Sequence, residues 1–267
     1  MVVMVGHELR LPDGVASPLL RKIRAVLPVS EAEQAAVEAL EQGGTPLPPQ
    51  SRIVADGGPY DGIGIVQACW MMRSKTLPDG RRQVINFALP GDFLCLDALT
   101  FDHAFYDLST LGRAVVTRRS VSEFEKLCSE FPRLAFAIKR LAVLEEAMLS
   151  ERLLSVGRRS AVEGVGHLLL ELWHRLRRVG LAGDRVMPMP LSQEIIGDAL
   201  GLSTVHVNRT LKALQDSGLI LVDHHRPRSI TVLDASRLER LAGFKSGYLQ
   251  LTGTVADEPP MRVRANA

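Results

Sequence analysis

Apolar side chains recur at intervals of three and four residues in several long stretches, which is the spacing of one face of an α-helix. This pattern predicts helices over residues 17–41, with a break at Pro28, and over residues 132–155 and 160–178. The second of these has a heptad-like stripe, formed by Leu134, Ala137, Leu141, Leu144 and Met148. Such a long helix after a small sheet domain has more apolar surface than that domain covers, so we expect the stripe to pair with a second copy across a two-fold axis.

Between residues 51 and 120 the pattern changes, because short apolar runs alternate with turn sequences. Asp79-Gly80 lies between the runs 71–77 and 84–89, which is a strong signal for a two-stranded hairpin. Several strands at this spacing predict a small antiparallel β-barrel or sandwich. The proline-rich residues 45–50 break the pattern, and residues 180–190 are expected to form a loop.

Residues 191–220 have the pattern of two short helices joined by a tight turn. Ser192 and Ser203 are suited to cap the two helices, and Gly201 is suited to the turn between them. At 100° per residue, the second helix has an apolar face and an opposite face of polar and basic groups near its N-terminal end. This arrangement predicts a helix-turn-helix whose second helix enters the major groove of DNA.

The side chains predicted to contact DNA have different tasks. Arg209 is suited to guanine O6 and N7, Asn208 to a base edge or a phosphate, and Val205 to a thymine methyl group. Phosphate contacts, which fix the register, suit the polar groups beside them and the basic tip of a wing made by strands at 219–222 and 229–233. The predicted set is Ser203, Thr204, Val205, His206, Asn208, Arg209, Lys212, Arg226 and Arg228.

The sequence L-S-Q-E-I-I-G-D-A-L-G-L-S-T-V-H-V-N-R-T-L-K-A-L, which begins at Leu191, resembles the C-terminal domain of the Crp/Fnr family of bacterial regulators. The turn P-G-D-F at 90–93 and the order of elements extend the resemblance over roughly residues 18–245. The resemblance implies an α+β protein that acts as a homodimer on double-stranded DNA, at a palindromic operator, with RNA polymerase as a partner.

The same resemblance gives the expected domain organisation. It comprises an N-terminal antiparallel β-barrel of the cyclic-nucleotide-binding type with N-terminal helices (17–131), a long dimerisation helix (132–157) and a C-terminal winged helix-turn-helix domain (158–246). The polar residues 252–267 are expected to form a disordered tail.

Two departures from the family pattern affect function. Val205 stands where the family commonly has Glu, while Arg209 is retained, so we do not carry the family's usual target sequence over to this chain. Members that bind cyclic AMP have a Gly-Glu pair for the ribose, where this chain has Cys95 and Leu96. They also have an Arg for the phosphate, and none lies near Ala104. We therefore expect no cofactor and no dependence on cyclic AMP.

The cysteines argue against other cofactors and a disulfide framework. Cys69, Cys95 and Cys128 are widely spaced, unlike zinc or disulfide sets, and no N-terminal cysteines are present to hold an iron–sulfur cluster. Cys95 is either a redox switch or a packed thiol, and its leucine neighbours favour packing. His103 is either a haem ligand or a surface residue, and its loop setting favours the surface.

Composition is that of a globular protein, with 46% hydrophobic and 23% charged residues among 267. The net charge of +2 is the sum of −2 in residues 1–150 and +4 in residues 151–267, and the excess in the second half is a weak indication of a polyanionic partner. The chain has neither a signal-peptide pattern nor an apolar run of about 18 residues, so we expect a cytoplasmic protein that does not enter a membrane.

Motifs of catalytic triads, phosphate loops and metalloproteases are missing, which argues against an enzyme. The alternative function is a ligand-sensing or adaptor protein of the same fold whose helix-turn-helix contacts a protein partner.

Overall fold

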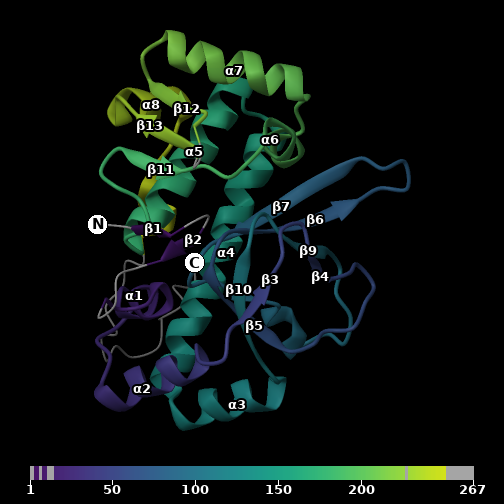
Figure 1. Ribbon diagram of the computed structural model, residues 1–267, viewed down its shortest axis with the longest axis vertical. Helices are drawn as coiled ribbons and strands as arrows, with labels where there is room; N and C mark the ends of the chain where they lie inside the picture. Colours follow the sequence, from purple (N-terminus) through teal and green to yellow (C-terminus); the bar gives the residue numbers. More distant parts are fainter. Residues whose placement is uncertain (1–2, 6–7, 11–14, 226–227, 251–267) are drawn as a thin grey trace, which may run out of the picture.

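The computed structural model describes residues 3–5, 8–10, 15–225 and 228–250. A sheet-rich N-terminal region and a mainly helical C-terminal region are joined by a long helix, α4 (Pro132–Gly157), as Figure 1 shows. The N-terminal region contains β1 (Val3–Val5), β2 (Glu8–Arg10), α1 (Pro18–Arg24), α2 (Glu31–Leu40), β3 (Thr45–Leu47), β4 (Arg52–Val54), β5 (Ile63–Ala68), β6 (Met71–Thr76), β7 (Arg82–Ala88), β8 (Phe93–Leu94), η1 (Leu96–Leu99), β9 (Asp107–Thr110), β10 (Ala114–Arg119) and α3 (Val121–Glu130). The C-terminal region contains α5 (Ala161–Arg178), β11 (Val186–Pro188), α6 (Gln193–Leu200), α7 (Thr204–Asp216), β12 (Ile220–Asp223), β13 (Ser229–Val232), α8 (Ala235–Ala242) and η2 (Ser246–Leu249). The mixed α+β class predicted from the sequence is confirmed.

Two four-stranded antiparallel sheets form the centre of the N-terminal region. Their strand orders are β3-β10-β5-β8 and β4-β9-β6-β7. Buried side chains from both sheets share one cluster, which includes Val66, Met71, Leu108 and Val116. Strand pairing within the described residues does not join the two sheets, so the domain is a sandwich of facing sheets rather than a closed barrel.

The predicted hairpin is present. Strands β6 and β7 pair in antiparallel register from Met71 opposite Ala88 to Thr76 opposite Arg82, with Asp79-Gly80 in the turn between them. Met71, Met72, Val84 and Phe87 are buried, whereas Lys75 and Thr76 next to the turn are exposed, so the hairpin packs into the core away from its turn.

Helix ends follow the capping signals in the sequence. The Ser160 hydroxyl accepts a hydrogen bond from the Glu163 backbone N–H, and the Glu163 carboxylate accepts one from the Ser160 N–H, so α5 begins with a capping box. Ser30 and Glu33 do the same for α2. The same motif at Ser120 begins α3, which the periodicity did not predict.

Two short edge strands correct the predicted loops. Residues 45–47 pair with β10, and residues 186–188 pair with β13. Each contains a proline, which an edge strand tolerates because one side of the strand needs no ladder hydrogen bond. The pairing depends on a neighbouring strand far along the chain, so local sequence carried no signal for it.

The predicted dimerisation stripe faces the inside of the protomer. Leu134 and Ala137 are 0% exposed and Met148 is 6% exposed, because they pack against the protomer's own core. Leu141 and Leu144 are half-buried. A partner helix cannot reach the first three side chains in this conformation, so these three are core packing instead of a dimer surface. For Leu141 and Leu144 the pairing stays a prediction. The opposite face of α4 exposes Phe136, Val143 and Leu154 instead.

Two expectations concern membranes and the tail. Among the helices in the described ranges, none combines the length and apolar character that a bilayer span requires. The tail predicted over residues 252–267 lies outside the described residues.

Candidate nucleic-acid interface

The helices α6 and α7 form a helix-turn-helix whose ends match the predicted caps. Ser192 Oγ accepts a hydrogen bond from the Ile195 backbone N–H, and Ser203 Oγ accepts one from His206 N–H. Gly201 ends α6 in the left-handed conformation with φ of 68°. The predicted tight turn is therefore present.

Gly197 explains how closely the second helix approaches the first. A Cβ atom on this residue would lie 2.4 Å from the carbonyl oxygen of Leu202, a distance that no side chain tolerates. Leu202 N–H donates to the Gly197 carbonyl at 3.0 Å, which closes the turn. A larger residue at 197 would therefore push α7 away from α6.

Helix α7 has one buried face and one exposed face. The buried side chains are Val207, Thr210, Leu211 and Leu214. The exposed side chains include every residue predicted on this helix and its cap to contact DNA: Ser203, Thr204, Val205, His206, Asn208, Arg209 and Lys212. The helix lies at one end of the molecule (Figure 1). The first three turns of α7 carry basic and polar groups and no carboxylate, which suits a polyanion together with the positive end of the helix dipole.

Gln193, which sequence reasoning did not select, joins this surface. It is the first residue of α6, and its Nε2 atom donates to Asn208 Oδ1 at 3.4 Å. This bond occupies the acceptor of the Asn208 amide and leaves its N–H groups free to donate outward. The sequence offered one signal for the role of Gln193, which is its position directly after the predicted helix cap Ser192.

The predicted wing is a hairpin of β12 and β13, with Asp223 opposite Ser229. The His225 backbone N–H donates to Asp223 Oδ1 at 2.8 Å at the start of the connecting turn. Arg228 is half-buried, and its carbonyl accepts a hydrogen bond from Met189 N–H. Arg226 lies outside the described residues.

Cys95 and Leu96, which replace the Gly-Glu pair of the family pattern, are buried and half-buried in the sheet domain. Cys95 is 4% exposed, and burial raises the pKa of its thiol to about 11, which suppresses the reactive thiolate. The nearby Asp97 accepts hydrogen bonds from the hydroxyl groups of Tyr60 at 2.6 Å and Tyr106 at 2.7 Å. His103, the candidate haem ligand, is exposed in a loop.

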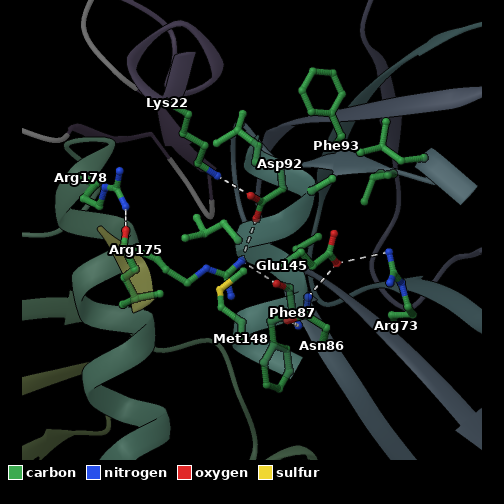
Figure 2. Close-up of a pocket in the computed structure, with 18 of the residues that line it drawn as sticks. Lys22, Arg73, Asn86, Phe87, Asp92, Phe93, Glu145, Met148, Arg175 and Arg178 are labelled. Atoms are coloured by element: carbon green, nitrogen blue, oxygen red, sulfur yellow. Dashed lines mark hydrogen bonds and ion pairs between the residues drawn. The ribbon is translucent and has the colours of Figure 1, made fainter. Parts of the chain in front are cut away.

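A cavity of about 60 Å³ lies where the sheet domain meets α4 and α5 (Figure 2). On one side Glu145 of α4 accepts a hydrogen bond from Asn86 Nδ2 at 2.8 Å and lies 3.3 Å from the Arg73 guanidinium. The polar groups of the cavity on this side are therefore bonded to one another.

On the other side of the cavity, Asp92 of the P-G-D-F turn lies between two cations. Lys22 Nζ is 2.5 Å from Asp92 Oδ1, and Arg175 Nη2 donates to Asp92 Oδ2 at 2.8 Å, as Figure 2 shows. Burial acts to raise the pKa of Asp92, but the two cations outweigh it and hold that pKa below its usual value. Arg175 also donates to the Phe87 carbonyl at 2.8 Å, so α5 is bonded to the sheet domain at a buried site.

Sequence comparison places these features among known regulators. The model of the Crp-like helix-turn-helix domain matches residues 165–241. The nitrogen fixation regulation protein FixK of Bradyrhizobium diazoefficiens is 39% identical over 168 residues, which cover 63% of this chain and 68% of FixK. The transcriptional activatory protein AadR of Rhodopseudomonas palustris is 33% identical over 169 residues, covering 63% of this chain and 68% of AadR.

Solved structures agree with this placement. The structure of FixK2 from Bradyrhizobium japonicum matches with a TM-score of 0.65 and 28% identity, over 74% of this chain and 96% of FixK2. A CooA mutant from Carboxydothermus hydrogenoformans has the same fold, with a TM-score of 0.62 at 14% identity over 87% of this chain and 98% of CooA. With an exposed polar face on α7, a matching domain model and relatives named as a nitrogen fixation regulation protein and a transcriptional activatory protein, the chain belongs to the Crp/Fnr family of DNA-binding transcriptional regulators.

Proposed function

We propose that the protein regulates transcription as a homodimer that inserts two copies of α7 into successive major grooves of a palindromic operator. The observation that carries this proposal is that α7 has one exposed face and one buried face. Asn208 and Arg209 are exposed, whereas Val207 and Thr210 are buried. A helix that packed only within a bundle would not need a carboxylate-free face of polar and basic groups directed outward.

The exposed side chains suit two kinds of contact. Arg209 pairs with guanine, and Val205, which is 67% exposed, contacts a thymine methyl group. Asn208, held by Gln193, donates to a base edge or a phosphate. The remaining residues contact phosphates from the helix start, its side and the wing: Ser203, Thr204, His206, Lys212, Arg226 and Arg228.

The exposed face of α4 is the proposed seam of the homodimer. Phe136 is 43% exposed, Val143 57% and Leu154 45%, and these positions follow the three- and four-residue steps of a coiled coil through Arg140, Ala147 and Ser150. The face lies opposite the side of α4 that packs in the protomer. Pairing two such faces removes exposed apolar surface from water and places the two DNA-binding domains on one two-fold axis.

The remaining parts of the proposal concern effector and partners. Binding does not require cyclic AMP, because Cys95 and Leu96 offer no group for a ribose and Glu145 is already engaged by Asn86 and Arg73. We include RNA polymerase as a partner because the relatives include named activators. A protein of this kind acts in the cytoplasm, where the DNA is, and does so without catalysis.

Selection of bound DNA from a random pool tests the proposal, with and without cyclic AMP. We expect enrichment of an inverted repeat whose half-sites lie about 34 Å apart, with the same result in both arms. A non-symmetric motif contradicts the homodimer, and enrichment only with cyclic AMP contradicts effector independence. Failure to enrich any sequence, with weak binding that does not respond to salt, favours the adaptor function.

A further inference from the structure

The first helix of the helix-turn-helix is held against the β6–β7 hairpin of the sheet domain. Arg82, the first residue of β7, has its Nε atom 2.8 Å and its Nη2 atom 2.6 Å from Asp198 Oδ2 of α6. The same Nη2 atom lies 3.5 Å from Glu194 Oε1. Beside it, Gln83 Nε2 donates to the Ala199 carbonyl at 3.4 Å. The side chains of Arg82 and Asp198 are 29% and 22% exposed, so water and salt screen this pair less than an ordinary surface pair.

Apolar packing extends the contact beneath this pair. One buried cluster contains Val84 and Phe87 of the hairpin together with Ile196, Ala199 and Leu200 of α6. In Figure 1, α6 lies beside β7 and α7 lies beyond it. Moving α6 away from the hairpin would therefore expose apolar surface as well as break an ion pair.

A second attachment fixes the orientation. Arg175 of α5 binds Asp92 and the Phe87 carbonyl at the far end of β7. Two attachments at separate points of one strand prevent the DNA-binding domain from rotating about either one.

We propose that Arg82, which lies outside the DNA-binding domain, is a positioning residue for DNA recognition. By holding α6 on the hairpin it fixes α7 relative to α4, and in the homodimer this sets the distance between the two recognition helices. The inference rests on the proposed function, because only a dimer that reads two half-sites depends on that distance.

The test measures dissociation constants for two DNAs, the operator selected from the random pool and a fragment with one half-site. The readout is the ratio of the two constants, because a change of charge near DNA affects both whereas a misplaced helix affects only the operator. The variants are Arg82→Glu, Asp198→Arg, the double exchange of both, and Arg81→Glu. Arg81 is the matched control, since it is adjacent and its side chain pairs with Asp79 within the hairpin turn.

We expect Arg82→Glu to reduce the preference for the operator about tenfold and to change half-site binding less than twofold. The double exchange should restore the preference to within about threefold of the wild type, and Arg81→Glu should leave it unchanged. An unchanged preference in Arg82→Glu, an equal loss on both DNAs, or a double exchange that restores nothing overturns the role of Arg82. A wild-type protein that binds both DNAs equally contradicts the proposed homodimeric function itself, which separates the two failures.

Discussion

On α7, residues that are adjacent in the sequence can lie on different faces of the helix, so a buried residue stands next to an exposed one. Val207 is 0% exposed and anchors the helix to the domain, whereas Asn208 and Arg209 beside it are exposed. Substituting an exposed residue should therefore change DNA binding with little effect on stability, and substituting a buried one should do the reverse. This separation makes the following substitutions interpretable.

Replacing Lys212 with Ala should weaken DNA binding by a similar factor on all sequences. Lys212 is proposed to contact a phosphate, so its loss should also reduce the slope of log affinity against log salt by about one. Fluorescence anisotropy across a salt series measures both. Lys126→Ala is the control, because α3 lies at the opposite end of the molecule from α7 (Figure 1). A slope that Lys212→Ala leaves at the wild-type value contradicts the phosphate contact.

His167 predicts a dependence of stability on pH. Burial and then the neighbouring Arg159 lower the pKa of His167 to about 4, against about 6.5 in an unfolded chain. Between these values the unfolded state binds a proton that the folded state does not. The free energy of unfolding should therefore fall by about 1 kcal/mol for each pH unit below 6.5, until about pH 4.

Urea unfolding at several pH values checks this prediction. His167→Gln should flatten the dependence between pH 6.5 and 4, while His103→Gln, at an exposed position, should not. If the two variants have the same pH profile, buried His167 is not the source of the dependence.

At the scale of elements, the exposed face of α4 predicts the oligomeric state. Val143→Glu should shift the protein from dimer to monomer, because it places a charge in the middle of the proposed seam. Sedimentation at micromolar concentration measures the shift. Leu153→Glu is the matched control, since Leu153 is 75% exposed but lies about 100° around the helix from Leu154. A Val143→Glu protein that sediments as a dimer contradicts the seam.

Helices with strong periodicity and caps could be predicted from the sequence. Apolar periodicity over residues 160–178 located α5, and Asp79-Gly80 located the β6–β7 turn. The same box at Ser120 and Glu123 was present in the sequence and was passed over, so α3 was missed. Strands β3 and β11 had no local signal, because pairing with distant strands makes them.

The side of α4 that faces a partner could not be predicted from periodicity. Packing against the same protomer and packing against a partner helix both require apolar side chains. A helix such as α4 that makes both contacts is therefore apolar on two faces. Leu134 and Ala137 turned out to serve the protomer, while Phe136 and Val143 remain exposed. Only the position of the sheet domain distinguishes the two sets.

At the scale of the whole molecule, Asp92 joins three segments, since it binds Lys22 of α1 and Arg175 of α5 from the turn before β8. Asp92→Asn leaves buried Arg175 and half-buried Lys22 without their carboxylate and should lower the free energy of unfolding by about 3–5 kcal/mol. Asp79→Asn, in the exposed hairpin turn, should change it by less than about 0.5 kcal/mol. Chemical denaturation measures both, and equal small effects contradict a structural role for the Asp92 site.

The exposed face of α7, which we propose contacts DNA, could be predicted because its residues lie in one continuous motif. The attachment of that motif to the sheet domain could not, because Arg82 and Asp198 are 116 residues apart in the chain. Neither residue has a local pattern that indicates its partner. Contacts between domains are therefore the part of this site that required the structure.

The central claim is that the exposed N-terminal half of α7 reads base pairs, and Arg209 tests it most directly. The measurement is the affinity of wild type and Arg209→Ala for the selected operator and for operators with one base pair changed at a time. We predict that Arg209→Ala loses about 1–3 kcal/mol on the operator and becomes indifferent to one guanine that the wild type requires. An equal loss on every operator and on random DNA, with no base pair losing its effect, would contradict the account.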